Sequence, residues 1–150
     1  MACRSARRLR LRMPEFARLT REAGHSWVEI ELTDWFAQWM AAHEYHQAYF
    51  DNPNDMDLAL KDFARYTITT LRARMTATDV DSDTVVAISG LASLFGLTSV
   101  SKIIDRVTPD IRGRLLAFFP GHKDGTVYYL LDACAGYNYV GIPILPTVVL

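Results

Sequence analysis

Two continuous apolar runs stand out in the pattern of hydrophobic and polar positions along the chain. Residues 84–88 are mostly β-branched and do not alternate with polar residues, and residues 115–119 form the second apolar run. A strand that is covered on both faces has this pattern. Ser89-Gly90 ends the first run, and the spacing predicts a helix near residues 100–106. Strands that alternate with helices in this way indicate a parallel or mixed sheet.

The chain before this stretch predicts three helices and one further strand. The first helix begins at Met13, with a proline in its first turn, and ends at Gly24. Residues 27–32 alternate apolar and acidic positions, which favours a strand with one more accessible face. Thr33 is placed to cap a helix whose large aromatic residues fall at helical spacing and predict a packed core face. After a polar loop, a long amphipathic helix reaches Met75.

The chain after the second apolar run predicts a hairpin and a final strand. Asp124-Gly125 is a strong turn signal within residues 122–125, and residues 126–131 supply the second strand of the hairpin. Residues 137–144 predict the last strand. We therefore expect an α/β fold in three layers, with a mixed, mostly parallel sheet of about five strands and helices on both faces.

Composition and charge are those of an ordinary globular chain. The 150 residues include 16 basic and 17 acidic side chains, so the net charge of −1 gives the whole chain no attraction for nucleic acid or anionic membranes. The two cysteines, Cys3 and Cys134, favour reduced thiols in a cytosol. No apolar run reaches the roughly 18 residues that cross a bilayer, and no signal peptide is visible. We expect a cytoplasmic protein that does not contact membranes.

The first twelve residues differ from the rest of the chain. They carry five arginines and almost no core-forming pattern: Arg4, Arg7, Arg8, Arg10 and Arg12. One interpretation is an arm that contacts nucleic acid or another anionic surface. The other, which we favour because a helix start follows at once, is a disordered basic tail. Residues 13–150 then form a single α/β domain, and the sequence leaves open whether that domain is truncated at either end.

Two features resemble binding motifs without completing them. His43 and His46 lie three residues apart, but they lack the spacing of a zinc-binding helix and a third ligand nearby. Gly90 and Gly96 follow a strand, yet Leu97 stands where a phosphate-binding loop has its lysine. We therefore expect neither a metal nor a cofactor.

The sequence motif of a serine hydrolase is likewise incomplete. Ser89 and Ser93 lie at a strand end, where the loops of α/β sheets commonly hold ligands, but no G-x-S-x-G elbow surrounds them. The simplest interpretation is that Ser89-Gly90 allows a tight exit from the sheet. A degenerate nucleotide-binding protein or a small hydrolase that uses Ser89, Gly90 and Ser93 stays open as an alternative, and a protein without catalytic activity is the favoured class.

A series of short motifs runs through the second half of the chain. They are Asp83-Thr84-Val85-Val86, Ser89-Gly90, Ser93-Leu94-Phe95, Leu115-Leu116-Ala117-Phe118-Phe119-Pro120-Gly121, Asp124-Gly125, and Tyr137-Asn138-Tyr139 before Ile142-Pro143. With these motifs the chain resembles the BrxB-like family of BREX phage-defence systems, a domain of unknown function. The motifs are structural rather than catalytic. The family usually opens with an apolar segment, where this chain has its arginine-rich stretch.

The resemblance implies a cytoplasmic, non-catalytic subunit that supports assembly of an anti-phage complex. Its implied partners are a phosphatase-like PglZ protein and a large AAA+ ATPase, beside a DNA methyltransferase, and nucleic acid is expected only through residues 4–12. We expect protein partners to bind the loops after Ile88 and Phe119, because loops at strand ends commonly carry function. The residues chosen on this ground are Phe95, Pro120, His122 and Asp124.

Overall fold

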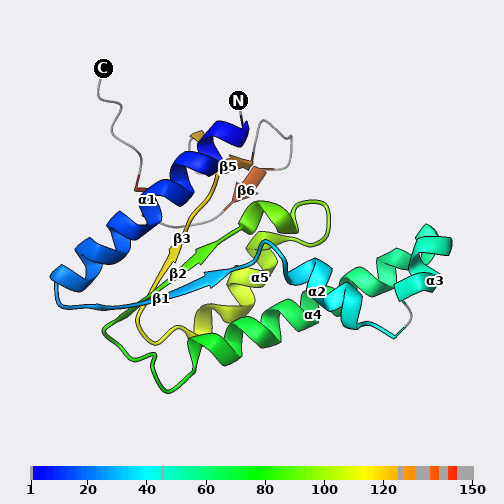
Figure 1. The fold of residues 1–150 in the computed structure, drawn as a ribbon, viewed down its shortest axis with the longest axis horizontal. Helices are drawn as coiled ribbons and strands as arrows, with labels where there is room; N and C mark the ends of the chain where they lie inside the picture. The colour runs from blue at the N-terminus through cyan, green and yellow to red at the C-terminus, as the bar shows by residue number, and fades with distance from the viewer. Residues whose placement is uncertain (1, 45, 125–126, 131–135, 139–141, 145–150) are drawn as a thin grey trace.

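Three parallel strands form the central sheet. The structure is a computed structural model that describes residues 2–44, 46–124, 127–130, 136–138 and 142–144. The strands are β1 (Ser26–Glu31), β2 (Thr84–Ser89) and β3 (Arg114–Ala117), in the order β1-β2-β3 (Figure 1). Val86 of β2 pairs with Val28 of β1 on one side and with Leu115 of β3 on the other. The strands predicted from both apolar runs are confirmed, and they are parallel.

Each face of β2 supports its own hydrophobic core. Val86 and Ile88 belong to the core on one face, and Ala87 packs with Met13 and Phe118 on the other. The helices that cover these faces are α1 (Ala2–Glu22), α4 (Met56–Met75) and α5 (Val100–Val107). In Figure 1, α1 lies above the strands, and α4 and α5 lie below them. The first apolar run does not alternate because both faces of β2 are buried.

The other described strands form a second, antiparallel sheet. They are β4 (Gly121–Asp124), β5 (Val127–Leu130) and β6 (Gly136–Asn138), in that order. One sheet of about five strands in three layers is therefore not confirmed, because the described strands divide into two sheets of three. Only two residues separate β4 from β5, and so short a connection allows antiparallel but not parallel pairing.

The hairpin after the second apolar run is confirmed, but residues 122–124, expected in its turn, lie in a strand. His122 and Asp124 belong to β4, and Asp124 pairs with Val127 of β5. Residues 122–124, which were expected in the turn, thus take part in strand pairing. The final strand is confirmed at residues 137–138 of β6, but residues 142–144, which were also expected in it, are not strand. Residues 139–141 and Cys134 lie outside the described residues.

Helix α1 begins at Ala2 rather than at Met13. This corrects the interpretation of the arginine-rich stretch as a disordered tail, since residues 2–12 are helical. Arginine and leucine are both good helix formers, so the sequence that lacks a core pattern still has high helix propensity. Pro14 lies inside the helix instead of opening it, and the helix tolerates one missing amide there.

The predicted end of α1 is confirmed. Gly24 has a left-handed backbone with a φ of 88°, a conformation that glycine adopts without steric cost. Its amide donates to the carbonyl of Arg21 at 3.0 Å, and the amide of His25 donates to the carbonyl of Thr20 at 3.1 Å. This pair of bonds is the Schellman pattern that satisfies the last carbonyls of a helix.

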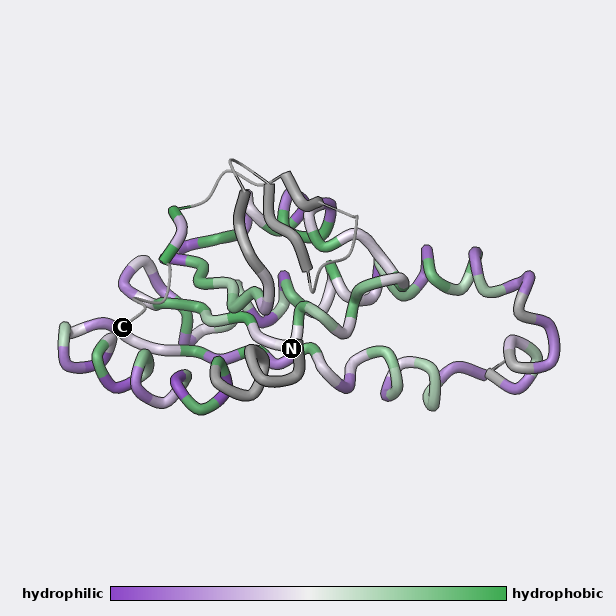
Figure 2. Tube along the Cα trace, turned by 90° about the horizontal axis from the view of Figure 1, so that it is seen from above, coloured by the Kyte–Doolittle hydropathy of each residue, from purple (hydrophilic) through white to green (hydrophobic). Residues whose placement is uncertain are grey.

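Helical segments between β1 and β2 form an arm that extends away from the sheet (Figure 2). The arm consists of α2 (Trp35–Ala42), α3 (His46–Asp51), a 3-10 turn (Pro53–Asp55) and the first half of α4. The buried ring of Phe63 lies 5.1 Å from the ring of Phe36 and 5.4 Å from that of Trp39. The aromatic residues of α2 therefore form a core face, as their spacing predicts.

The expected cap of α2 is wrong. Asp34 occupies the N-cap position, and its side chain makes no capping hydrogen bond. The hydroxyl of Thr33 donates instead to a carboxylate oxygen of Glu31 at 3.0 Å. A carboxylate is the stronger acceptor, and the one that ends β1 lies within reach of this hydroxyl.

A tight turn closed by Asp81 leads into β2. The hydroxyl of Thr84 and the amide of Asp83 both donate to one carboxylate oxygen of Asp81, at 2.8 and 2.9 Å. These bonds, led by the one from Thr84, lower the pKa of Asp81 below its usual 3.8. Gly113 passes close to the turn: a Cβ atom there would lie 2.1 Å from the carbonyl oxygen of Thr84. The turn that precedes β2 and the residue that precedes β3 are therefore closely packed against each other.

Replacing Gly113 by alanine is expected to destabilise the fold, because the new Cβ overlaps backbone atoms that cannot rotate away. The free energy of unfolding, measured by urea denaturation, should fall by about 3 kcal/mol. Gly24→Ala is the control, since its Cβ meets nothing within 4 Å and only the positive φ is strained, at a cost of about 1 kcal/mol. Equal losses for both variants would contradict the close fit at Gly113.

Replacing Asp81 by asparagine is expected to flatten the acid side of the stability profile. A carboxyl whose pKa is lower in the folded than in the unfolded chain contributes stability above the unfolded value of 3.8, and that contribution disappears as the pH falls through the folded value. Asparagine keeps an acceptor oxygen but does not titrate. Between pH 5 and about pH 2, the variant should therefore lose less stability than the natural chain in thermal unfolding experiments; an identical loss would be the contrary result.

Candidate functional site

The carboxyl ends of the three parallel strands meet at one edge of the sheet. There β1 continues into Leu32, β2 ends at Ser89, and β3 continues to Phe118, whose amide donates to the carbonyl of Ile88 at 2.8 Å. Loops at this edge are where parallel sheets commonly bind ligands. The loops after Ile88 and Phe119, chosen from the sequence, both begin here.

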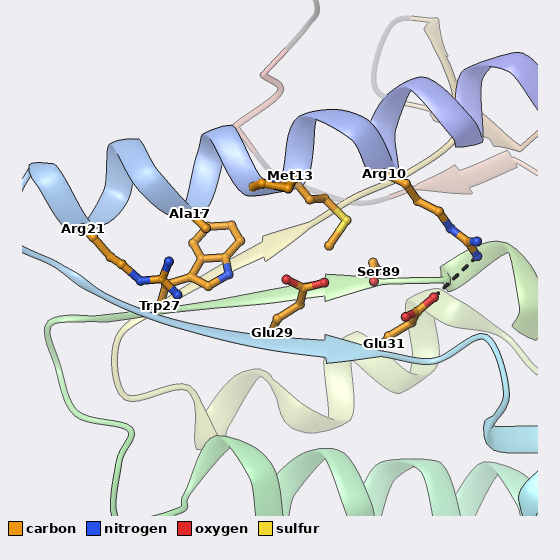
Figure 3. A pocket seen from close by; sticks show the side chains of 9 residues that line it. Arg10, Met13, Ala17, Arg21, Trp27, Glu29, Glu31 and Ser89 are labelled. Atoms are coloured by element: carbon orange, nitrogen blue, oxygen red, sulfur yellow. Dashed lines mark ion pairs between the residues drawn. The ribbon is translucent and has the colours of Figure 1, made fainter.

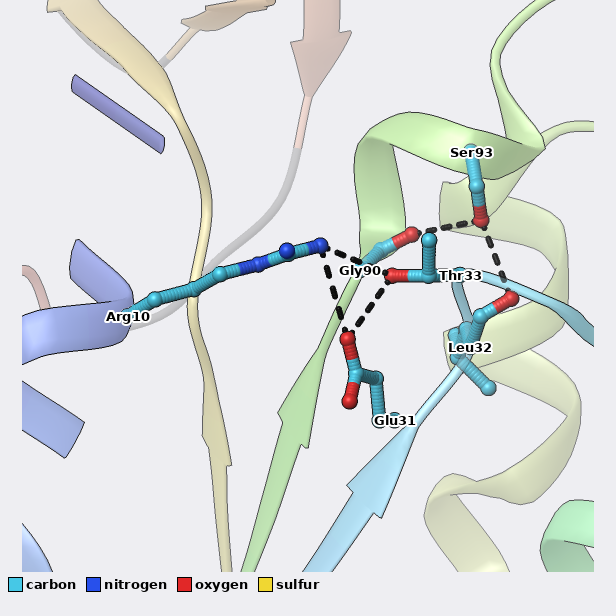
Figure 4. A network of polar contacts seen from close by, with 6 residues as sticks. All are labelled: Arg10, Glu31, Leu32, Thr33, Gly90 and Ser93. Carbon is cyan, nitrogen blue, oxygen red and sulfur yellow. Dashed lines mark hydrogen bonds and ion pairs between the residues drawn. The ribbon is translucent and has the colours of Figure 1, made fainter. Parts of the chain in front are cut away.

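Gly90 lets the chain leave β2 sharply. Its φ is 75°, and a Cβ at this position would lie 2.7 Å from the amide nitrogen of Thr33. The neighbouring Ser93 hydroxyl lies 2.7 Å from the carbonyl oxygen of Gly90 and 3.1 Å from that of Leu32, and it can donate to either (Figure 4). Ser93 thus links the loop after β2 to the end of β1, and its hydroxyl group serves a structural role.

A polar network joins α1 to the same edge. The Arg10 guanidinium lies 3.3 Å from the hydroxyl oxygen of Thr33 and 3.5 Å from a carboxylate oxygen of Glu31 (Figure 4). The side chains of Arg10 and Glu31 are 63% and 55% exposed, so water screens this pair and its contribution to stability is small. Its effect is to direct Arg10 across the ends of β1 and β2.

A cleft of about 540 Å³ lies between α1 and the sheet (Figure 3). Residues of α1 form one wall and alternate residues of β1 form the other, with Ser89 of β2 at the base: Arg10, Met13, Pro14, Ala17, Arg21, Trp27, Glu29, Glu31 and Ser89. The indole N–H of Trp27 and the hydroxyl of Ser89 are buried and make no hydrogen bond with the described residues. Two arginines and two glutamates line the cleft, so their charges cancel.

The structure brings together four of the residues selected from the sequence. Ser89, Gly90, Ser93 and Pro120 line one small cavity of about 130 Å³ next to the larger cleft. Pro120 is buried, so its ring presents little surface to a partner.

The other three selected residues lie outside that cavity. Phe95 is 42% exposed and follows the short helix η2 (Leu91–Leu94). His122 and Asp124 occupy β4, and their side chains are outside the described residues.

Sequence reasoning missed the larger cleft. The alternation of residues 27–32 places Trp27, Glu29 and Glu31 on one face of β1 and Ile30 on the other. That signal was available, because two acidic residues on one strand face predict an open surface. Most of the opposite wall lies in the helix predicted to begin at Met13, but Arg10 was not expected to belong to a helix.

Of the two histidines in the sequence pair, only the side chain of His43 is among the described residues. The ring of His43 lies 5.0 Å from that of Trp39 and 5.3 Å from that of Tyr49, which places it within the aromatic side of the arm. Within the described ranges, no group of three or more histidine, cysteine, aspartate or glutamate residues is arranged to hold a metal ion.

Three comparisons with known proteins gave no match. No family model matches the chain, and neither a curated protein nor a solved structure matches it. Among the described residues, no helix combines the length and the apolar character that crossing a membrane requires. The resemblance to the BrxB-like family therefore stays a prediction from the sequence.

Replacing Ser93 by alanine should loosen the edge of the sheet. The variant loses the hydroxyl that bridges the loop after β2 to Leu32, and the free energy of unfolding in urea should fall by about 1 kcal/mol. Ser82→Ala is the matched control, because Ser82 is exposed in the turn before β2; its effect should stay within about 0.5 kcal/mol. A neutral Ser93→Ala variant would show that the bridge does not stabilise the edge.

Proposed function

We propose that the chain is a non-catalytic interaction subunit that binds a protein partner through the loop after β2. The observation that carries this proposal is Phe95, a phenyl ring that is 42% exposed at the carboxyl edge of the sheet. Large aromatic residues that are presented on rigid loops are frequent anchors of protein interfaces.

The backbone around Phe95 is firmly held. Leu94, directly before it, is buried at 1% exposure, and its carbonyl accepts hydrogen bonds from the amides of Leu97 and Thr98, each at 3.0 Å. The amide of Phe95 itself donates to the carbonyl of Ala92 at 3.2 Å. The backbone that carries the ring is therefore ordered before a partner binds. This order lowers the conformational entropy that is lost on binding.

The biological setting that we propose is a cytoplasmic complex of a BREX-type phage-defence system. This setting rests on the sequence resemblance to the BrxB-like family and on no other observation. The partners that we propose in this setting are the phosphatase-like PglZ protein and the AAA+ ATPase. We also propose that the chain forms a single three-layer domain with one mixed sheet of about five strands, as the sequence predicts.

Nucleotide binding or hydrolysis is less well supported by the same edge. A polyphosphate needs an excess of positive charge or a cradle of free amides, whereas the cleft balances Arg10 and Arg21 against Glu29 and Glu31. The Ser93 hydroxyl already lies within hydrogen-bonding distance of two backbone carbonyls. Both features favour an interaction surface over a reaction centre.

Co-expression with the PglZ-like phosphatase and the AAA+ ATPase tests the proposal. We expect the full chain to co-elute with at least one of them at a defined mass in size-exclusion chromatography with light scattering. Phe95→Ala should abolish co-elution, because the substitution removes the exposed ring and leaves the backbone contacts of the loop in place.

Leu58→Ala is the matched control for this experiment. Leu58 is an apolar residue that is 66% exposed on α4, far along the arm, and its removal should leave co-elution unchanged. A chain that stays monomeric in the presence of both proteins would overturn the proposed partners. Co-elution that survives Phe95→Ala would overturn the proposed surface.

A further inference from the structure

Helix α1 carries a strong excess of positive charge. This helix carries seven arginines, no lysine and two glutamates, although the whole chain has a net charge of −1. The arginines are Arg4, Arg7, Arg8, Arg10, Arg12, Arg18 and Arg21. An excess of five positive charges on 21 residues is the electrostatic footprint of a surface that binds polyanions.

The packing of α1 decides which side faces the solvent. Met13 and Ala17 are each 6% exposed and lie against the sheet, and Phe16 packs on Phe118 with ring centroids 5.4 Å apart. Leu11, on the opposite side of the helix, is 72% exposed. The apolar side of the helix is therefore occupied by the sheet, and the remaining side is open.

The open side of α1 divides into two halves. In the C-terminal half, one guanidinium nitrogen of Arg18 donates to both carboxylate oxygens of Glu22, at 2.6 and 2.8 Å, so its charge is already paired. In the N-terminal half, Arg12 is exposed and forms no ion pair with the described residues. Residues 4, 8 and 12 are each one helical turn apart, and residue 7 is adjacent to this row.

We propose that residues 4–12 of α1 bind the phosphodiester backbone of double-stranded nucleic acid without reading its sequence. Guanidinium groups suit phosphate because their planar donors form two parallel hydrogen bonds with it. Residues 4–12 span about 12 Å along the helix axis. That length of duplex carries roughly seven phosphate charges. Arg10 is directed toward Glu31, so the four other arginines of this stretch can each meet a different phosphate: Arg4, Arg7, Arg8 and Arg12.

The same geometry argues against a lipid surface. A helix that lies on a membrane inserts its apolar side among the acyl chains. In α1, Met13, Phe16 and Ala17 on that side are packed against the sheet. Leu11 and Leu19, exposed at 72% and 49%, do not form a comparable apolar face. The proposal is independent of the Phe95 surface, which lies on a different element.

The test is fluorescence anisotropy with the full chain and a labelled DNA duplex of about 20 base pairs, titrated at several salt concentrations. If all four arginines contact phosphate, the logarithm of the binding constant should fall against the logarithm of salt with a slope of about −3.6. Arg12→Gln should reduce the magnitude of this slope by about 0.9, and combined substitution of Arg4, Arg7 and Arg8 by glutamine by about 2.7. Two duplexes of unrelated sequence should bind equally.

Arg18→Gln is the matched control, because it removes one arginine from the same open side whose charge is already paired. It should leave the slope unchanged, and circular dichroism should confirm that every variant keeps its helix content, as expected for glutamine. An equal change of slope for Arg12→Gln and Arg18→Gln would overturn the assignment to residues 4–12. No binding to DNA at 50 mM salt, or binding to phosphatidylserine vesicles alone, would overturn the proposal.

Discussion

Burial of β2 on both faces is the constraint on which the rest of the structure depends. Its backbone pairs with β1 and β3, while Val86 and Ile88 enter one core and Ala87 enters the other. Every side chain of β2 must therefore be small or apolar, because neither face offers water as a hydrogen-bond partner. Only at its two ends does the strand carry hydroxyl groups, in Thr84 and Ser89.

The two ends of β2 meet this constraint differently. Thr84 is fully buried and exchanges hydrogen bonds with Asp81, so its hydroxyl is satisfied within the turn that starts the strand. Ser89 is 6% exposed, and its hydroxyl has no partner among the described residues. The first end is closed by its own loop, whereas the second opens toward the cleft under α1. This difference is why the candidate site lies at the carboxyl edge.

Much of the fold could be predicted from the sequence because burial leaves a direct pattern. The non-alternating run in β2, the alternation in β1 and the glycine that ends α1 each follow from local physical rules. The start of α1 could not be predicted in this way, because arginines carry no core pattern although they favour helix. The hairpin of β4 and β5 was predicted, but its place in a second sheet was not, because no local pattern shows which strands share a sheet.

The site was less accessible to sequence reasoning than the fold. Ser89, Gly90, Ser93 and Pro120 were selected as strand-end residues, and the structure does bring them together. The cleft beside them required knowing that α1 lies over β1, a tertiary arrangement that no local pattern encodes. The cap expected from Thr33 failed for a related reason, because its hydroxyl found a carboxylate on the neighbouring strand.

The long connection through the arm has a consequence for how the molecule folds. Strands β1 and β2 are joined through α2, α3 and α4, and His25 at the start of β1 meets Asp83 across a separation of 58 residues. By contrast, the connection between β2 and β3 is shorter and contains η2, α5 and a 3-10 turn at Thr108–Asp110. Contacts between distant residues form slowly, because the intervening chain must be ordered first. We therefore expect β2, α5 and β3 to fold together early. Strand β1 should pair with β2 later, after α4 has formed and brought β1 closer to β2.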